Sequence, residues 1–112
     1  MSNMNNLRNK VQLIGNLGKD VEFKQLENGS AIARVSIATK EVYKTPKGEK
    51  IIDVQWHQLV GWGKVAEIMH VLLKKGKEVA VQGKLTHRSY EDEQGNKRQV
   101  SEVVVDEFML IQ

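Results

Sequence analysis

The sequence has 112 residues, enough for one domain (residues 1–112) with a single modest core. It contains no cysteine, which excludes disulfide bonds and thiolate metal sites, and no apolar run approaches the ~18 residues of a membrane-spanning helix. Lys and Arg number 17 against 14 Asp and Glu, a net charge of +3 that permits a polyanionic partner without demanding one. The N-terminal residues lack the apolar segment of a secretory signal, so we expect a cytoplasmic protein.

Strand-like stretches follow one another along the chain, beginning with residues 10–17 (KVQLIGNL), where Gly15 predicts a bulge or bend. Residues 15–20 (GNLGKD) superficially resemble a phosphate loop. No Ser or Thr follows the Gly-Lys pair and no helix begins there, so we interpret them as a bend between two halves of one strand. Asn28-Gly29 predicts a hairpin turn. Further strands are predicted at 31–39, 51–62, 78–90 and 99–110, with polar loops at 43–50 and 91–98.

Residues 64–76 (KVAEIMHVLLKKG) interrupt this pattern, because their apolar side chains recur at helical spacing. Lys74 and Lys75 suit the negative end of a helix dipole, and Gly76 is interpreted as the residue just past the helix. The order is therefore three strands, one helix and two strands. A small sheet with one helix protects its edges by closing. This predicts an all-β fold: a five-stranded oligonucleotide/oligosaccharide-binding (OB) barrel with its α-helix between strands 3 and 4.

The sequence offers no pattern for catalysis or for a metal site. Its three histidines, His57, His70 and His87, have no metal-ligand spacing, and no nucleophile motif is present. The acidic run at 91–93 lacks the alternating oxygen donors of a calcium loop, so we interpret it as part of a solvated hairpin loop. We therefore expect no catalytic residue, no metal and no cofactor.

Four of the six aromatic residues lie in polar or basic surroundings, at strand ends and beside loops. Single-stranded nucleic acid needs such an arrangement, since every base can stack on an aromatic face and its phosphate needs a nearby cation. Each ring alone is equally well explained as a half-buried surface aromatic. Four together on a predicted barrel favour binding. Two fall in the short run 56–64 (WHQLVGWGK), where Gly61 and Gly63 are interpreted as leaving room for a nucleotide. The four are Tyr43, Trp56, Trp62 and Tyr90.

Five segments of the chain carry a family resemblance: NKVQLIGNLGKD (9–20), NGSAIARVSIAT (28–39), WHQLVGWGKVAE (56–67), LKKGKEVAVQGKL (73–85) and SEVVVDEFMLI (101–111). On these segments the sequence resembles the bacterial single-stranded DNA-binding protein family along nearly its whole length. The resemblance implies an OB-fold barrel, a homotetramer, and sequence-independent binding and protection of single-stranded DNA in replication, recombination and repair. It places the family's base-stacking aromatics at the four positions above, although Tyr43 and Tyr90 stand where tryptophan is common and Trp62 where phenylalanine is common. It also places His57 at a subunit contact.

Basic residues near the predicted strands are candidates for contacts with the DNA backbone, and for each a solubilising surface role is the ordinary alternative. Family members usually continue into a flexible linker and an acidic tip that recruits other proteins. Because this sequence ends at Gln112, we expect DNA binding without tail-mediated repair and replication partners, and without a membrane partner. The candidate backbone contacts are Lys10, Arg34, Lys64, Lys74, Lys75, Lys84 and Arg88.

Three alternative functions stay open at this point. The first is an OB-fold binder of RNA, oligosaccharide or another ligand; an RNA site would need dedicated contacts to the 2′-hydroxyl, and no such signature stands out. A small barrel nuclease would need clustered carboxylates for metal ions, whereas the acids here are dispersed. A pure interaction protein would fail to bind a long oligothymidine at low salt.

Overall fold

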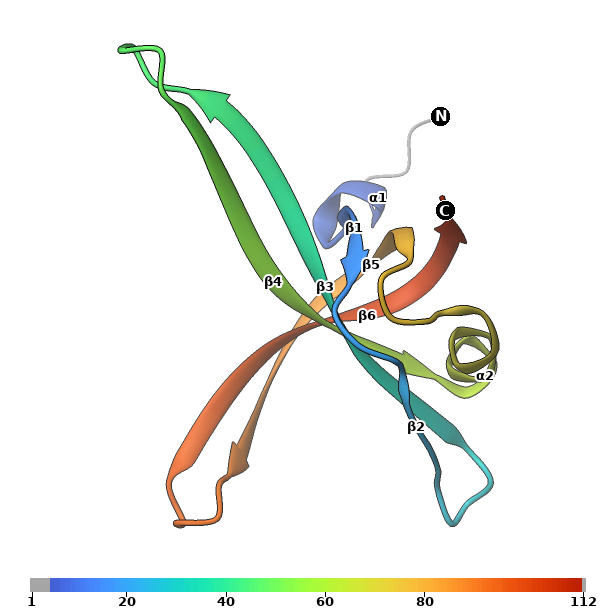
Figure 1. The fold of residues 1–112 in the computed structure, drawn as a ribbon. Coiled ribbons are helices and arrows are strands. Elements are labelled where there is room, and N and C mark those ends of the chain that lie inside the picture. The colour runs from blue at the N-terminus through green and yellow to red at the C-terminus, as the bar shows by residue number, and fades with distance from the viewer. Residues whose placement is uncertain (1–4, 112) are drawn as a thin grey trace.

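A computed structural model describes residues 5–111 of the chain (Figure 1). Strands dominate it, and a one-turn helix near the N-terminus, α1, is an element that the sequence analysis did not predict. No helix within residues 5–111 is long and apolar enough to cross a membrane. In chain order the elements are α1 (Asn5–Arg8), β1 (Val11–Leu17), β2 (Glu22–Gln25), β3 (Ala31–Lys44), β4 (Lys50–Trp62), α2 (Gly63–Leu72), β5 (Glu78–Glu91) and β6 (Lys97–Leu110).

The sheet closes on itself. Its strand order is β1-β5-β6-β4-β3-β2, and β1 also pairs with β3, where Asn16 lies opposite Ala38. Gly15 precedes this closure, and a Cβ there would collide with the carbonyl oxygen of Ala38, so only glycine lets β1 approach β3 so closely. Both β1 and β2 pair with β3 and only residues 18–21 separate them, so they form two halves of one strand. The predicted five-stranded OB barrel, with α2 between its third and fourth strands (β4 and β5), is confirmed.

The core fills the barrel interior. Ala33, Val35 and Ile37 alternate along β3 and are fully buried, as the period of two in the sequence indicates. Leu59 of β4 meets them from the neighbouring strand, and Met69 of α2 is buried with them, because the helix covers one end of the barrel. The predicted hairpin turn at Asn28-Gly29 is present between β2 and β3.

Helix α2 ends earlier than the sequence predicts. Its last residue is Leu72, and Leu73 follows in an extended conformation (φ −94°, ψ 124°) with 1% of its surface exposed. Burying Leu73 in the core draws the chain out of the helical path, so residues 74–76 lie beyond the helix and their interpretation as its end is wrong. Gly76 instead lies in a turn, where its N–H donates to the carbonyl oxygen of Leu17 (2.9 Å).

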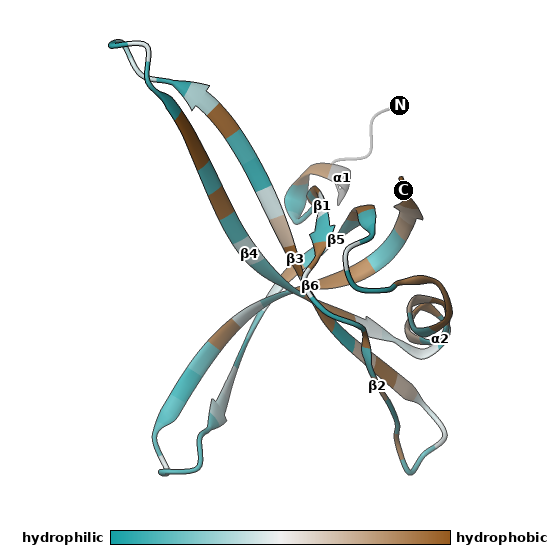
Figure 2. Ribbon diagram, in the orientation of Figure 1, coloured by the Kyte–Doolittle hydropathy of each residue, from teal (hydrophilic) through white to brown (hydrophobic). Residues whose placement is uncertain are grey.

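Two long hairpins extend beyond the barrel, and Figure 1 shows them projecting from it in different directions. We call residues 40–54 the β3–β4 arm and residues 87–100 the β5–β6 arm. No residue of either arm is buried, and their tips are coloured hydrophilic in Figure 2. The strands run further into both arms than predicted, so the polar loops shrink to residues 45–49 and 92–96. Backbone hydrogen bonds between the two strands of each arm hold these polar residues in the sheet, although no buried face lies beneath them.

Candidate nucleic-acid interface

The aromatic side chains divide into two groups. Phe23 and Phe108 are partly buried and pack against the core. The four aromatics selected from the sequence are about half exposed instead, so none of them is a core residue. Their exposed fractions are 52% for Tyr43, 59% for Trp56, 48% for Trp62 and 46% for Tyr90.

Both tryptophans point to the same side of β4. Leu59 faces the barrel interior and is fully buried. Successive side chains of a strand point to opposite faces, so Trp56, Gln58 and Trp62 face outward and are exposed, whereas Val60 on the same side is buried. Two large rings on one outward face, six residues apart, form the start of an extended surface.

The register carries this surface across the neighbouring strands. Arg34 of β3 and Glu102 of β6 pair with outward-facing residues of β4. On β5, Thr86 lies opposite Glu102 and faces outward. An even number of positions separates it from Lys84, Arg88 and Tyr90, so these side chains face outward as well. We call this side of β3, β4, β6 and β5 the outer face. It brings together three of the four predicted aromatics and three of the seven predicted basic residues.

Tyr43 lies apart from the other three rings. It pairs with Ile51 near the tip of the β3–β4 arm, whereas Trp56 pairs with Ala38. The odd spacing between Ala38 and Tyr43 places Tyr43 on the other face of the two-stranded ladder. At ~3.4 Å per residue it also lies about 17 Å further along the arm. A nucleic acid that reaches both rings must follow the twist of the hairpin.

Trp56 rests against Gly18, a residue whose sequence context predicts only a bend. A Cβ on Gly18 would lie 2.5 Å from Cζ3 and 2.8 Å from Cη2 of the indole. Gly18 belongs to the link 18–21 between β1 and β2, and its N–H donates to the carbonyl oxygen of Ser36 (3.1 Å). The link therefore holds one edge of the Trp56 ring in place while most of the ring stays exposed.

Glu102 is a second residue that sequence reasoning missed. It lies on the outer face, yet only 6% of its surface is exposed because two arginines cover it. Nη1 of Arg34 donates to one carboxylate oxygen, and Nε of Arg88 donates to the other at 2.9 Å. The guanidinium carbon of Arg88 also lies 5.5 Å from the centroid of the Tyr90 ring, within cation–π range.

Gly61 does not leave room for a nucleotide, and that interpretation is wrong. The residue is buried, and a Cβ there would collide with the sulfur of Met69. Glycine at this position lets α2 pack closely against β4. Gly63, in contrast, has open space around it and a φ of +59°, a conformation that lets the chain turn from Trp62 into α2.

The remaining basic residues are distributed around the molecule. Lys64 is exposed in the first turn of α2, directly after the end of β4. Lys74 and Lys75 lie in the link after α2, where the backbone N–H of Lys75 donates to a carboxylate of the 18–21 link (2.8 Å). Lys10 lies at the start of β1 with its Nζ 3.5 Å from Asp106.

The family model described as "Single-strand binding protein family" matches residues 8–111. The chain belongs to this family. The resemblance stated from the sequence is thus confirmed.

Relatives and solved structures agree with this assignment. The chain is 38% identical to "Single-stranded DNA-binding protein 1" of Xylella fastidiosa over 104 residues, which cover 92% of this chain and 76% of the relative. It is 36% identical to the protein of the same name from Chlorobaculum tepidum, over 92% of this chain and 64% of that relative. The solved structure of a Plasmodium falciparum SSB complex with ssDNA superposes with a TM-score of 0.82 at 27% identity, covering 93% of this chain and 95% of that one.

In this family member, His57 lies on the inward-facing side of β4. It is half-buried, with its Nε2 2.9 Å from Oγ1 of Thr39. It lines a hollow that also includes Gln12 and Ile14 of β1. The contact with Thr39 is made within one chain, and the predicted role of His57 at a subunit contact stays a prediction.

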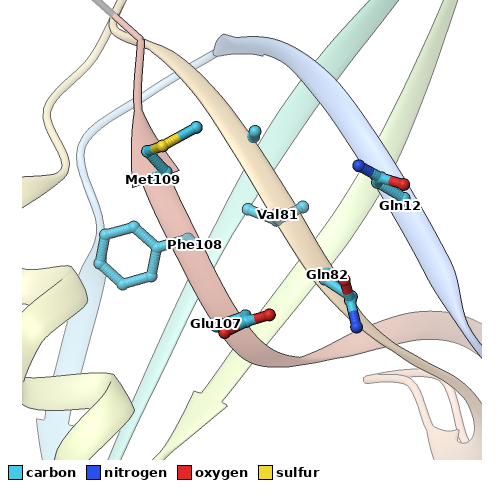
Figure 3. A pocket seen from close by; sticks show the side chains of 7 residues that line it. Gln12, Val81, Gln82, Glu107, Phe108 and Met109 are labelled. Atoms are coloured by element: carbon cyan, nitrogen blue, oxygen red, sulfur yellow. The ribbon is translucent and has the colours of Figure 1, made fainter. Parts of the chain in front are cut away.

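The pocket in Figure 3 is formed by β1, β5 and β6. Gln12, Gln82 and Met109 line it together with a single ionisable side chain, Glu107. One carboxylate without an acid, base or nucleophile beside it gives no arrangement for acid–base chemistry. Among the residues that the structure describes, no group of three or more His, Asp or Glu side chains is placed to hold a metal ion.

The acidic run at 91–93 belongs to the tip of the β5–β6 arm. Asp92 accepts backbone N–H groups from Gln94 (3.0 Å) and Asn96 (2.9 Å) and a bond from Nε of Arg98 (2.9 Å). The hydrogen bond from Arg98, and then that from Asn96, lower the pKa of Asp92 below its usual value. This carboxylate shapes a hairpin turn, in keeping with the loop that the sequence predicts.

Proposed function

We propose that this chain binds single-stranded DNA without regard to base order, by stacking bases on Tyr43, Trp56, Trp62 and Tyr90 and by holding the backbone with Lys and Arg side chains. The observation that carries the proposal is the outer face. It exposes three large rings that the core does not need, and cations lie beside them. Base–aromatic stacking contributes about 1–3 kcal/mol per base and tolerates any sequence, since every base has a π-face.

The proposal includes the setting in which such binding is useful. The chain would coat and protect single strands exposed in replication, recombination and repair, in the cytoplasm with the nucleoid. It acts as a binder and carries out no catalysis. The family assignment and the names of the relatives support this role.

The proposal also includes a homo-oligomer, most simply a tetramer, with His57 at or near a subunit contact. The surface of β1, β5 and β6 supports it. Ile14 and Met109 are 52% and 64% exposed there. A second copy that covers this surface would bury apolar area and leave the aromatic rings free for DNA.

The test is a titration with oligothymidines of increasing length, followed by tryptophan fluorescence. Stacking on Trp56 and Trp62 should quench the emission deeply and saturably. The slope of log affinity against log salt should be roughly −0.7 per phosphate neutralised. Absence of binding at low salt would favour a pure interaction protein, and a hundredfold preference for one mixed sequence would contradict stacking.

Two further arms of the same experiment separate the rival functions. Competition between matched DNA and RNA oligomers distinguishes a DNA binder from an RNA binder, because an RNA site needs contacts to the 2′-hydroxyl. Incubation of labelled DNA with pure protein and magnesium or calcium distinguishes binding from cleavage. Time-dependent cleavage would overturn the proposal of a non-enzymatic role.

A further inference from the structure

Glu102 is the single charged residue with a buried side chain in the part of the chain that the structure describes. A buried carboxylate is unfavourable unless it is paired and hydrogen-bonded. Both oxygens of Glu102 are used, one by Arg34 and the other by Arg88. The carboxylate therefore ties together two strands of the barrel that are not neighbours, β3 and β5, across β4 and β6.

The cluster of Arg34, Glu102 and Arg88 is not electrically neutral. Two guanidinium groups share one carboxylate, which leaves one positive charge over. Arg34 uses Nη1 and Arg88 uses Nε for Glu102, so each guanidinium keeps further N–H donors. The two arginine side chains are 35% and 45% exposed, and these donors are available to a ligand on the outer face.

The cluster lies between the rings of the outer face. Glu102 is paired with β4 at Gln58, two residues from Trp56, and Arg88 stands two residues from Tyr90 on β5. Arg88 contacts the Tyr90 ring as well as Glu102. A single strand that stacks on β4 and on β5 must carry its backbone across this cluster.

We propose that Glu102 is a positioning residue that holds Arg34 and Arg88 as a seat for one backbone phosphate of single-stranded DNA. The inference rests on the proposed function and adds a specific phosphate site to it. One unneutralised positive charge matches one phosphate. Guanidinium groups already fixed by Glu102 lose less rotamer entropy on binding than free arginines, and their planar fork suits a phosphate.

The alternative is that the cluster only braces the barrel. Salt dependence separates the two, because a brace changes stability but not the number of phosphates neutralised. Oligothymidine affinity is measured against salt concentration for the unmodified chain and for Arg34→Gln, Arg88→Gln, Arg88→Lys and Glu102→Gln. Arg8→Gln is the matched control, because Arg8 is an exposed arginine on α1, outside the outer face.

The seat predicts a different outcome for each variant. Arg34→Gln and Arg88→Gln each leave a neutral cluster. The slope of log affinity against log salt should therefore become shallower by roughly 0.7. Over a tenfold rise in salt, each variant should then lose about fivefold less affinity than the unmodified chain loses. Arg88→Lys should keep the slope but bind more weakly at every salt concentration, because lysine lacks the fork. Glu102→Gln should steepen the slope by about the same amount, since each freed arginine can neutralise a phosphate of its own.

Arg8→Gln should leave the slope unchanged. Slopes equal to that of the unmodified chain in folded Arg34→Gln and Arg88→Gln would overturn the phosphate seat while the proposed function stands. Failure of the unmodified chain to bind oligothymidine would overturn the proposed function itself. If Glu102→Gln does not fold, the arginine variants still decide, because each leaves Glu102 with one partner.

Discussion

Replacing Gly18 by alanine should weaken DNA binding through Trp56 alone. The new Cβ would lie 2.5 Å and 2.8 Å from two carbons of the indole. Carbon atoms in contact are separated by about 3.5–4.0 Å, so the ring must move by roughly 1 Å. The backbone is no obstacle, since Gly18 is not in the left-handed region that favours glycine. Alanine at a compatible position instead stabilises the fold by about 0.4–1 kcal/mol, through the unfolded chain.

The loss of affinity has an upper bound in the contribution of the ring. Stacking of one base on an aromatic side chain contributes about 1–3 kcal/mol. A ring displaced by about 1 Å keeps part of this contact, so we expect a loss of about 1 kcal/mol, roughly a fivefold rise in Kd. The melting temperature should stay equal or rise slightly, which distinguishes this effect from general damage to the fold.

A double-mutant cycle measures whether Gly18 acts through Trp56. Kd for a labelled oligothymidine is determined for the unmodified chain, Gly18→Ala, Trp56→Ala and the double variant. Gly18→Ala should weaken the unmodified chain about fivefold and have no further effect when Trp56 is already alanine. Equal losses in both backgrounds would show that Gly18 does not act through Trp56. No loss in either background would refute the reasoning that the position of the ring matters.

Four other outcomes follow from the same surface. Trp56→Ala and Trp62→Ala should each weaken binding by about 1–3 kcal/mol per base stacked, with the fold kept, whereas Phe108→Ala should lower the melting temperature and spare the affinity of the folded protein. Unchanged affinity and quenching in both tryptophan variants would contradict stacking. Tyr43→Ala should weaken binding of long oligothymidines but not of the shortest ones that bind, because the ring lies about 17 Å along the arm; an equal effect at all lengths would argue against this path. Lys64→Glu should lower affinity similarly for all sequences and flatten the salt slope, and a sequence-dependent effect would count against a backbone contact. Light scattering at micromolar concentration should give a mass above 12.7 kDa, and a 12.7 kDa species alone would exclude the oligomer.

Local patterns were enough to predict the barrel. Alternation along β3, the Asn28-Gly29 turn and the helical spacing before Leu72 are properties of neighbouring residues, and the structure has all three. The end of α2 could not be found in this way. Lysines followed by Gly76 form a good helix end locally, but the chain leaves the helix earlier, because Leu73 is buried in the core. Such a choice depends on residues distant in sequence.

The same division holds for the candidate site. The aromatics were found because their sequence neighbours are polar, which is local information. Glu102 and Gly18 were missed because their partners are distant: Glu102 binds an arginine 68 positions away, and Gly18, in the link between β1 and β2, lies against Trp56 of β4. Gly61 was misread for the converse reason. A glycine between two large residues suggests room for a ligand, but here the sulfur of Met69 in α2 occupies that space.

The two arms lie outside the hydrophobic core. Residues 40–54 and 87–100 include no buried residue, so most substitutions there should alter the free energy of unfolding by less than about 0.5 kcal/mol; Arg88, which bonds the buried Glu102, is the exception. Tyr43 and Tyr90 lie in these arms, while the buried core residues lie elsewhere. The affinity for a ligand and the stability of the fold can therefore change independently. Selection or design can exchange ring types along the arms to tighten or loosen binding, without first having to recover lost stability.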